Sequence, residues 1–359
     1  MSRERLLEYQ LTSASAQQAV EVGLADAEWF HPQVPRQRLK QLMQRNDGPA
    51  LVYTGLWLGA LIVSGVGVIL TWGTWWTIPF LLIYGPLYAS ASDSRWHESG
   101  HGTAFKTRWM NTFVYELASF MLMRDPTLWK WSHTRHHSDT IIVGRDPEIL
   151  AMRPARLARI LLNFFSLADL PQSTWLMIKH AAGRLSVEER LIVPESEWRK
   201  IPRTARIWVA TYAAVIIACL ATGSILPLVL IGGPRIYGSF LLMIYSLTQH
   251  TGLGENVLDH RLNTRTVKMC WFNRFMYWNM NYHIEHHLFP MVPFHQLPAL
   301  HEEIKHDLPE PYPSLFAAYR EIIPAVFRQL KDQTYYIRRE LPPGAAPYFE
   351  PALLRKEVG

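Results

Sequence analysis

Three short histidine clusters constrain this sequence more than any other feature. The first reads W-H-E-S-G-H and contains His97 and His101, the second is H-T-R-H-H at 133–137, and the third is H-I-E-H-H at 283–287. Residues three and four positions apart share one face of a helix, so each cluster directs its imidazoles to one place. Imidazole suits iron, copper, nickel or zinc rather than magnesium or calcium, and eight nitrogens exceed what one tetrahedral zinc uses. We therefore predict a centre of two metal ions.

Apolar residues are gathered into long runs, although the hydrophobic content of the 359-residue chain is an ordinary 49%. Runs 51–70 and 77–91 form one pair, and runs 207–221 and 225–247 form a second pair. About 20 apolar residues are needed for a helix to cross a bilayer core. We predict an all-α integral membrane protein with four transmembrane helices in two hairpins and a helical cytoplasmic cap that holds the metal site. A soluble protein with buried core helices is the alternative, because several runs are short.

The distribution of charge predicts an orientation in the membrane. Lys and Arg are frequent in the first 50 residues, between the two apolar pairs and in the C-terminal third, whereas the connectors 71–77 and 222–226 carry no charge. By the positive-inside rule, the charged parts and both termini are cytoplasmic. This bias and anionic lipid head groups account for the net charge of +6, so no nucleic-acid partner is expected.

These patterns divide the chain into five segments. They are a cytoplasmic N-terminal segment at 1–50 with a basic membrane-surface helix at 36–45, a first transmembrane hairpin at 51–92, a cytoplasmic region at 93–206 with the first two clusters, a second hairpin at 207–250, and a cytoplasmic region at 251–359 with the third cluster and a Pro-rich tail. The first hairpin is expected to continue as a helix into the first cluster. Asp125 and Pro126 are expected to start the helix of the second cluster.

Histidines outside the clusters differ in their setting. His250 lies where the last apolar run meets the cytoplasm, as His97 does, and we interpret it as a ninth ligand. Several other histidines occur singly. We expect a surface position for His31, a structural one for His180, and pocket-rim or surface positions for His295, His301 and His306.

Two other functions use part of this pattern. The segment H-E-S-G-H fits the H-E-x-x-H signature of zinc proteases, with Glu98 as the general base. A zinc protease needs one further ligand, which leaves most of the other histidines without a purpose. A metal transporter is a non-enzymatic alternative, but transporters place ionisable ligands within the span, and these clusters lie outside the apolar runs.

The three clusters together resemble those of the integral-membrane fatty acid desaturase and hydroxylase superfamily, and the resemblance extends over about residues 51–298. It implies nine iron ligands: His97, His101, His133, His136, His137, His250, His283, His286 and His287. The first box has three residues between its histidines, as in lipid-acting and bacterial members. Acyl-CoA members have four, and they also have an asparagine four positions before the ninth histidine that holds an iron-bound water. Ser246 occupies that position here.

Acidic residues near the boxes are candidates to support the ligands, because a ligating histidine usually donates its second N–H to a carboxylate or carbonyl. Asp146 is the first choice, followed by Glu98 and Glu285, with Asp93 and Asp139 behind them. Gln249, next to His250, is a further support residue.

The electrons for such a centre must come from another protein. Cys219 and Cys270 are the two cysteines, too few for an in-chain iron–sulfur cluster, and no Gly-x-Gly-x-x-Gly fingerprint follows a strand pattern. We expect a ferredoxin or Rieske-type carrier with its reductase, docked on the basic cytoplasmic face.

The resemblance implies O2-dependent oxidation of an unactivated C–H bond by two irons that cycle between Fe2+ and Fe3+. Desaturation of a fatty acyl lipid is the main hypothesis, and the aromatic and Met-rich residues 109–123 are candidates to line an apolar tunnel. Hydroxylation or oxidative demethylation of a small polar molecule is the alternative. The segments 102–106 and 131–137 are similar in style to bacterial ferredoxin-dependent members, which implies a bacterial inner membrane.

Overall fold

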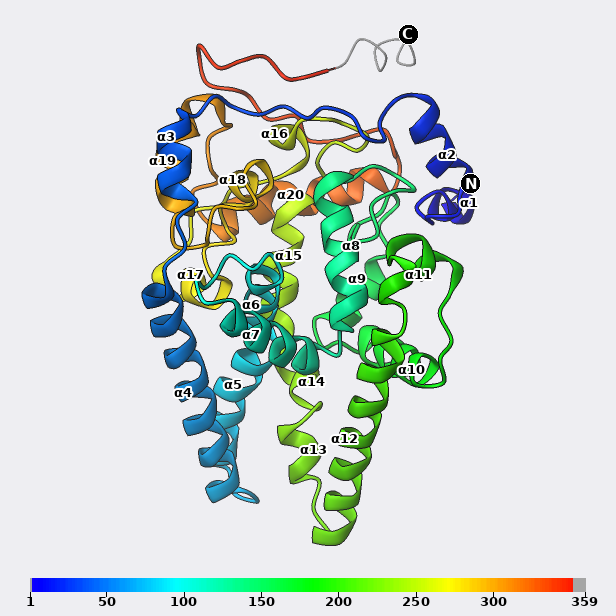
Figure 1. Cartoon of the computed structure of the whole chain (residues 1–359), viewed down its shortest axis with the longest axis vertical. Helices are drawn as coiled ribbons and strands as arrows, with labels where there is room; N and C mark the ends of the chain where they lie inside the picture. Colours follow the sequence, from blue (N-terminus) through cyan, green and yellow to red (C-terminus); the bar gives the residue numbers. More distant parts are fainter. Residues whose placement is uncertain (1, 351–359) are drawn as a thin grey trace.

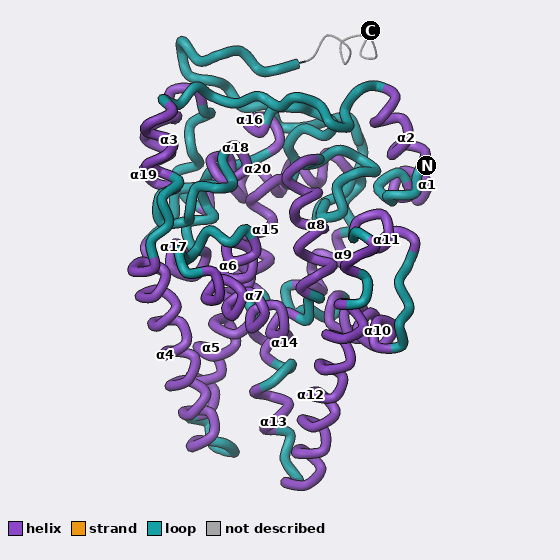
Figure 2. The backbone as a smooth tube through the Cα atoms, in the orientation of Figure 1, coloured by secondary structure: helices purple, strands orange, loops and turns teal. Residues whose placement is uncertain are grey.

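The computed structural model describes residues 2–350, and its regular structure is helical (Figure 1, Figure 2). Within these residues, β-structure is limited to two isolated bridges, which join Thr266 to Tyr282 and Val267 to Tyr312. The predicted all-α class is confirmed for this part of the chain. The end of the predicted C-terminal segment, 351–359, lies outside the described residues.

The helices follow one another along the chain from three short ones near the N-terminus, which are α1 (Ser2–Leu7), α2 (Ala14–Glu21) and α3 (Arg36–Leu42). Next come α4 (Asp47–Thr71), α5 (Thr77–Tyr88), α6 (Ser90–Gly100), α7 (Arg108–Leu122), α8 (Pro126–Ser138), α9 (Leu157–Asn163), α10 (Asp169–Ala181) and α11 (Val187–Ile192). The second half contains α12 (Lys200–Thr222), α13 (Leu226–Leu230), α14 (Pro234–Gly238), α15 (Phe240–His250), α16 (His260–Asn263), α17 (Trp271–Tyr277), α18 (His283–Leu288), α19 (Leu297–Ile304) and α20 (Leu315–Gln329).

Two helical hairpins, α4–α5 and α12–α13, extend from the same end of the molecule, and most other helices form a cap above them (Figure 1). Two helical stretches, Arg36–Thr71 and Glu195–Thr222, are long and apolar enough to cross a membrane. The large side chains exposed on the hairpins are apolar and include Ile62, Val63, Leu70, Trp75, Trp76, Leu82, Ile216, Ile217 and Leu220. Exposed apolar surface of this extent is typical of a membrane-facing region.

The return legs of the hairpins are built from shorter helices than the sequence predicts. The first passes from α5 into α6, and the second is divided into α13, α14 and α15. The second leg breaks at Gly232, whose φ of +86° favours glycine, and at Pro234, which has no backbone N–H to continue a helix. Two of the four predicted spans are therefore single long helices, and the other two are interrupted.

A close crossing of α5 and α14 joins the two hairpins at the base of the cap. A Cβ atom on Gly238 would lie 2.0 Å from the backbone oxygen of Gly85, and a Cβ on Gly85 would lie 2.4 Å from the Tyr237 ring. Only glycine permits this approach of the two backbones. The crossing sets the position of α15, which follows α14 directly and carries His250.

Two predicted features of the ligand-bearing helices are confirmed. α5 continues into α6 with only a slight interruption at Ala89, whose N–H still donates to the Gly85 oxygen at 2.8 Å. Asp125 caps α8, and its carboxylate accepts from the backbone N–H groups of Thr127 at 3.0 Å and Leu128 at 2.9 Å. Both devices place a histidine box at a defined position on a rigid element.

Helix α3 forms within the predicted basic segment 36–45. It packs beside α19 in the cap (Figure 1), where the Arg38 Nε atom lies 3.1 Å from the Glu303 carboxylate and Leu42 is buried in the main core. Protein therefore covers the Leu42 side of this short helix, and its position at a membrane surface stays a prediction.

The main core connects the first hairpin with the C-terminal helices beneath the histidines. Arg95 of α6 is fully buried there, and its guanidinium donates to the Met276 backbone oxygen at 2.6 Å. It also lies over the rings of Trp57, Phe275 and Trp278. These contacts satisfy much of the charge and tie α6 to α4 and α17.

Candidate metal centre

Nine histidines from four elements converge inside the cap. They come from the end of α6 (His97, His101), from α8 (His133, His136, His137), from the end of α15 (His250) and from α18 (His283, His286, His287). Five of them, His97, His101, His133, His137 and His286, form one group whose nitrogens lie within 4.8 Å of one another. His136, His250 and His287 form a second such group. His283 adjoins the second group, because its Nε2 atom is 3.2 Å from Nε2 of both His250 and His287.

The helical spacing of each box explains this convergence. In α8, His133 and His137 are one turn apart and direct their Nε2 atoms to within 3.2 Å of each other. In α18, His283 and His287 do the same at 3.2 Å. His136 of α8 points to the group of three, and His286 of α18 points to the group of five. Each of these two boxes therefore contributes histidines to both sides of the site.

Burial favours the uncharged form of most of these imidazoles. Burial, followed by the charge of neighbouring histidines, lowers the pKa of seven of them well below the ordinary value of 6.5: His97, His101, His137, His250, His283, His286 and His287. The pKa of His136 is raised, since the Asp146 carboxylate outweighs the opposing effect of burial. Neutral imidazole is the form that binds a transition metal.

The donor set fits metal ions better than it fits hydrogen bonding. Nε2 of His133 lies 3.1 Å from Nε2 of His101 and 3.2 Å from that of His137. Two nitrogens bound at about 2.1 Å to one ion, at right angles, are about 3 Å apart. Since Nδ1 of His133 already carries the donated proton, its Nε2 is an acceptor, and a cation between these lone pairs is the simplest way to satisfy them. Each of the two groups therefore suits one ion.

Outer partners orient four of the nine rings. Nδ1 of His136 donates to Asp146 at 2.9 Å, and Nδ1 of His133 donates to Glu148 at 3.0 Å. Nδ1 of His250 donates to the backbone oxygen of Asn263 at 2.8 Å. The Thr140 hydroxyl, which donates to a backbone oxygen, lies 3.2 Å from Nδ1 of His287. These contacts leave each Nε2 lone pair directed at the centre.

Glu148 is a support residue that the sequence prediction did not include. It follows Asp146 by two positions, and its side chain also accepts from Ser132 at 2.8 Å. Burial would raise the pKa of Glu148, but the adjacent His133 outweighs burial and lowers the pKa to about 2. The signal was present in the segment Asp-Pro-Glu, where a turn brings both carboxylates beneath α8.

Three other predicted support residues contact something other than a ligand ring. Glu98 accepts from the Phe294 backbone N–H at 3.0 Å. Glu285 accepts from the Thr266 hydroxyl at 2.5 Å and from His301. Gln249 donates to the Tyr277 hydroxyl at 2.6 Å. They hold the surrounding helices together instead, because neighbouring residues of a helix point about 100° apart and each side chain leaves its helix in a different direction from the adjacent histidine.

Asp93 and Asp139, the remaining candidate support residues, form ion pairs with arginines. Asp93 forms an ion pair with Arg124 at 2.5 Å. Asp139 pairs with Arg145 at 3.1 Å and with Arg135 at 3.5 Å. Neither has a hydrogen bond to a ring of the nine histidines in the part of the chain that is described.

The isolated histidines remain outside the centre, with one change in their expected positions. His180 pairs with Glu189 at 2.8 Å, and His306 is exposed. His301 is buried and bonded to Glu285, so the predicted rim or surface position is wrong for it. His260, not singled out in the sequence, stacks on Trp29 with ring centroids 4.4 Å apart.

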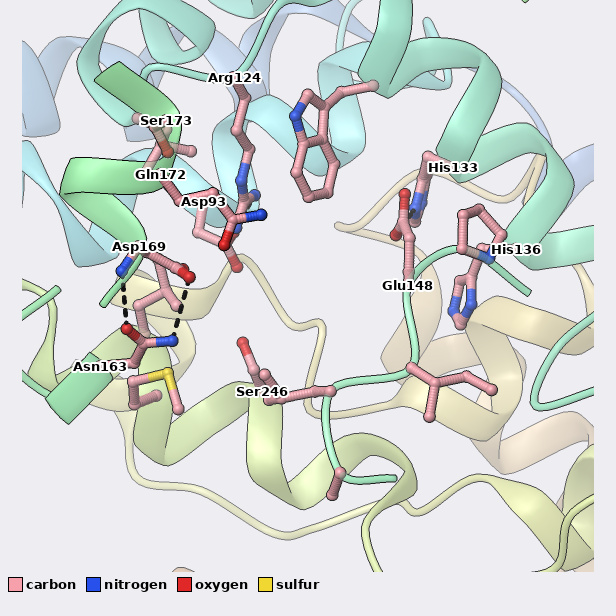
Figure 3. A pocket seen from close by; sticks show the side chains of 18 of the residues that line it. Asp93, Arg124, His133, His136, Glu148, Asn163, Asp169, Gln172, Ser173 and Ser246 are labelled. Carbon is pink, nitrogen blue, oxygen red and sulfur yellow. Dashed lines mark hydrogen bonds and ion pairs between the residues drawn. The ribbon is translucent and has the colours of Figure 1, made fainter. Parts of the chain in front are cut away.

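A cavity of about 700 Å³ adjoins the histidines. His97, His133, His136, His250 and His283 form one part of its wall. Figure 3 shows polar side chains around the rest of the space, including Asp93, Arg124, Asn163, Asp169, Gln172, Ser173 and Ser246. Of the expected tunnel residues 109–123, only Leu122 and Met123 line it. The cavity is thus partly polar and large enough for a small-molecule or chain-like substrate.

Comparison with known proteins identifies the class of this one. The family described as fatty acid desaturase matches residues 70–319, and the chain belongs to that family. An acyl-lipid (9-3)-desaturase from Physcomitrium patens is 26% identical over 233 residues. The matched region covers 56% of this chain and 42% of that relative, so the chain spans less than half of the relative's length.

Family membership and the two histidine groups agree with each other, because both groups could hold a metal ion. The protease alternative does not agree with the site. Glu98, its required general base, is bonded to the Phe294 backbone, and all three boxes converge where a single zinc would use only part of them.

Proposed function

We propose that the nine histidines hold two irons and that the protein oxidises an unactivated C–H bond with O2 and external electrons. Iron bound there supplies the reduction of O2 and the oxidant that removes hydrogen from carbon. The observation that carries this proposal is the pair of adjacent groups of imidazoles, five and three with His283 beside them, next to one cavity. The chain's own groups orient the rings, keep them neutral and shield the centre from bulk water.

Desaturation of an acyl chain is the first candidate reaction. It is supported by the family and by the relative's activity on acyl lipids. Apolar side chains on the cavity wall offer contacts to a hydrocarbon: Trp96, Leu122, Met123, Leu128, Trp129, Leu176, Met177, Leu242 and Met243.

Hydroxylation or oxidative demethylation of a small polar molecule is the second candidate, and the polar side chains of the cavity favour it. Asp93, Asn163, Asp169 and Gln172 lie on the wall that faces the histidines (Figure 3). Contact with a pure hydrocarbon would remove these polar groups from water without adding a hydrogen-bond partner, which is costly. Ser246, one helical turn before His250, adds a small polar group close to the centre.

We also propose that the two hairpins cross the membrane and that the cap and both termini are cytoplasmic. The uncharged turns at 71–77 and 222–226 and the basic segments at the cap support this orientation. Electrons would then reach the centre from a cytoplasmic ferredoxin or Rieske-type carrier and its reductase. Lys130, beside a shallow hollow lined by His101 and His133, offers a basic contact to an acidic carrier.

The reaction is tested by expressing the chain with a ferredoxin and its reductase, and by comparing host acyl chains and polar metabolites by mass spectrometry. Loss of two hydrogen atoms from an acyl chain supports desaturation. Gain of an oxygen atom, or loss of a methyl group, in a small molecule supports the second candidate. Protein cleavage without O2 contradicts both. A matched strain with His133→Ala controls for host enzymes.

A further inference from the structure

One face of α14 and α15 forms a continuous wall of the cavity. Arg235, Ser239, Leu242, Ser246 and His250 recur at helical spacing along it, and all of them line the same space. A helix rises about 1.5 Å per residue, so Arg235 and His250 lie roughly 22 Å apart along this wall. The cavity thus has a histidine end and an arginine end.

Arg235 is buried, with 6% of its surface exposed, yet the Nη1 atom of its guanidinium has no hydrogen-bond partner among the described residues. No acidic group of that part of the chain lies within 4.0 Å of it. Asp169 is the carboxylate that most influences it, but its Oδ1 atom accepts from Arg159 at 3.2 Å and from Asn163 at 3.1 Å. Arg124, a further positive charge nearby, is itself paired with Asp93.

Each of the other buried arginines contacts a backbone oxygen or a carboxylate of the protein. Arg95 donates to Met276 at 2.6 Å, and Arg265 donates to a backbone oxygen at 2.6 Å. Arg261 binds the Asp259 carboxylate at 2.7 Å, and Arg153 lies 3.3 Å from Glu255. Arg235 differs from all four, because it lines a cavity and lacks such a contact.

An unpaired buried cation is costly unless another group compensates it. The guanidinium presents a planar fork of N–H donors that matches carboxylate and phosphate oxygens. An oxyanion entering the cavity would satisfy it at no cost to existing contacts, since no protein acceptor needs to be displaced.

We infer that Arg235 binds a carboxylate or phosphate group of the substrate, while the oxidisable part extends along α15 toward the histidines. This inference rests on the proposed function for its second half, the position of the oxidised carbon. It assigns the substrate to the class of anionic amphiphiles: the head group lies at the base of the cap and the chain lies beside Leu242, Met243 and Ser246. It also gives the mixed polar and apolar wall a single occupant.

The test uses the full chain purified in a neutral detergent, with octanoate, octyl phosphate and octanol as probes. Binding is followed by the shift in melting temperature with probe concentration. We expect both anions to bind the native protein more tightly than octanol, and Arg235→Gln to weaken anion binding by more than about tenfold while octanol is unchanged. The matched control is Arg156→Gln, an exposed arginine on the same cavity, which should leave all three affinities unaltered.

Two further variants separate a binding role from a structural one. Without probe, Arg235→Gln should be at least as stable as the native protein, because it removes an unpaired buried charge. If that variant fails to fold, Arg235→Lys provides the test: it keeps the charge but loses the fork, so anion binding should be weaker than in the native protein and still tighter than that of octanol. A difference between octanoate and octyl phosphate distinguishes a free acid from a phospholipid-type head group.

The two proposals fail in different ways. Equal anion binding by native protein and Arg235→Gln, or preferential binding of octanol, overturns the anion site even if the protein contains iron and oxidises a substrate. Conversely, Arg235-dependent anion binding in a protein that contains no iron and consumes no O2 retains the anion site and overturns the proposed function.

Discussion

At the scale of single residues, the centre depends on proton placement. Each ring can direct a lone pair inward only if its other nitrogen carries the proton, and Asp146 and Glu148 enforce this for His136 and His133. Because both carboxylates lie in one turn after α8, a short segment controls one ring in each metal group. Such outer partners commonly affect metal affinity nearly as much as the ligands themselves.

Removal of either carboxylate should weaken metal binding. Asp146→Asn and Glu148→Gln keep the shape of the side chain but no longer fix the ring proton, so we expect a loss of iron affinity or activity of about 10- to 100-fold. Iron per chain, measured after dialysis against a weak chelator, tests this. Glu195→Gln, at an exposed position, is the control. Native iron content in both carboxylate variants would show that the contacts are dispensable.

Acid should destabilise the metal-free protein through its buried histidines. Their pKa values are lowered by burial in the folded state, so the unfolded chain binds more protons once the pH falls below about 6.5. Stability therefore rises with pH in this window and is lost as pH falls. The melting temperature should decrease as the pH is lowered from about 8 to about 5, and it should decrease most steeply below about pH 6.5. His97→Phe should flatten the curve, and an unchanged profile would contradict the neutral state of the rings.

At the scale of elements, the relation between the hairpins decides where His250 lies. Gly85 and Gly238 bring α5 and α14 into backbone contact, and the rigid continuation of each leg carries His97 and His250 to the same place. The interruption at Gly232 and Pro234 gives α14 the freedom to take this position. The two hairpins thus position the metal centre as well as anchoring it.

The crossing predicts a sharp difference between two glycine substitutions. In Gly238→Ala, the new Cβ would lie 2.0 Å from the Gly85 oxygen, so the helices must separate, and we expect a loss of about 1–3 kcal/mol or more of stability together with weaker metal binding. In Gly55→Ala, on the open face of α4, the Cβ meets nothing within 4 Å, and stability should be unchanged or slightly higher. Thermal unfolding and iron content of both variants test this, and equal behaviour would refute the role of the crossing.

At the scale of the whole molecule, the cap that contains the nine histidines lies above two apolar hairpins (Figure 1). The cavity lies between the cap helices and the α14–α15 leg, within reach of the membrane-facing end. If the hairpins cross the membrane as proposed, a substrate could enter this cavity from the bilayer interface.

Turnover should depend on a separate electron carrier. The sequence contains two cysteines, too few for an internal cluster, so the purified protein with NADPH alone should consume no O2. Addition of a ferredoxin and its reductase should start turnover. Lys130→Glu should raise the concentration of carrier needed for half-maximal rate, at an unchanged maximal rate, and high salt should act in the same direction. Activity with NADPH and the isolated chain would contradict the prediction.

Local patterns predict the histidine boxes, the all-α class, the continuation of α5 into α6 and the start of α8, because helical spacing and capping are properties of neighbouring residues. The partners of Glu98, Glu285 and Gln249 could not be predicted, because they depend on which element lies opposite each side chain. For the same reason, the contact between α3 and α19 could not be predicted. The unpaired state of Arg235 is likewise a property of the assembled cavity: in the sequence it is one arginine among many, and only the packing of α10, α14 and α15 removes it from water without supplying an acceptor.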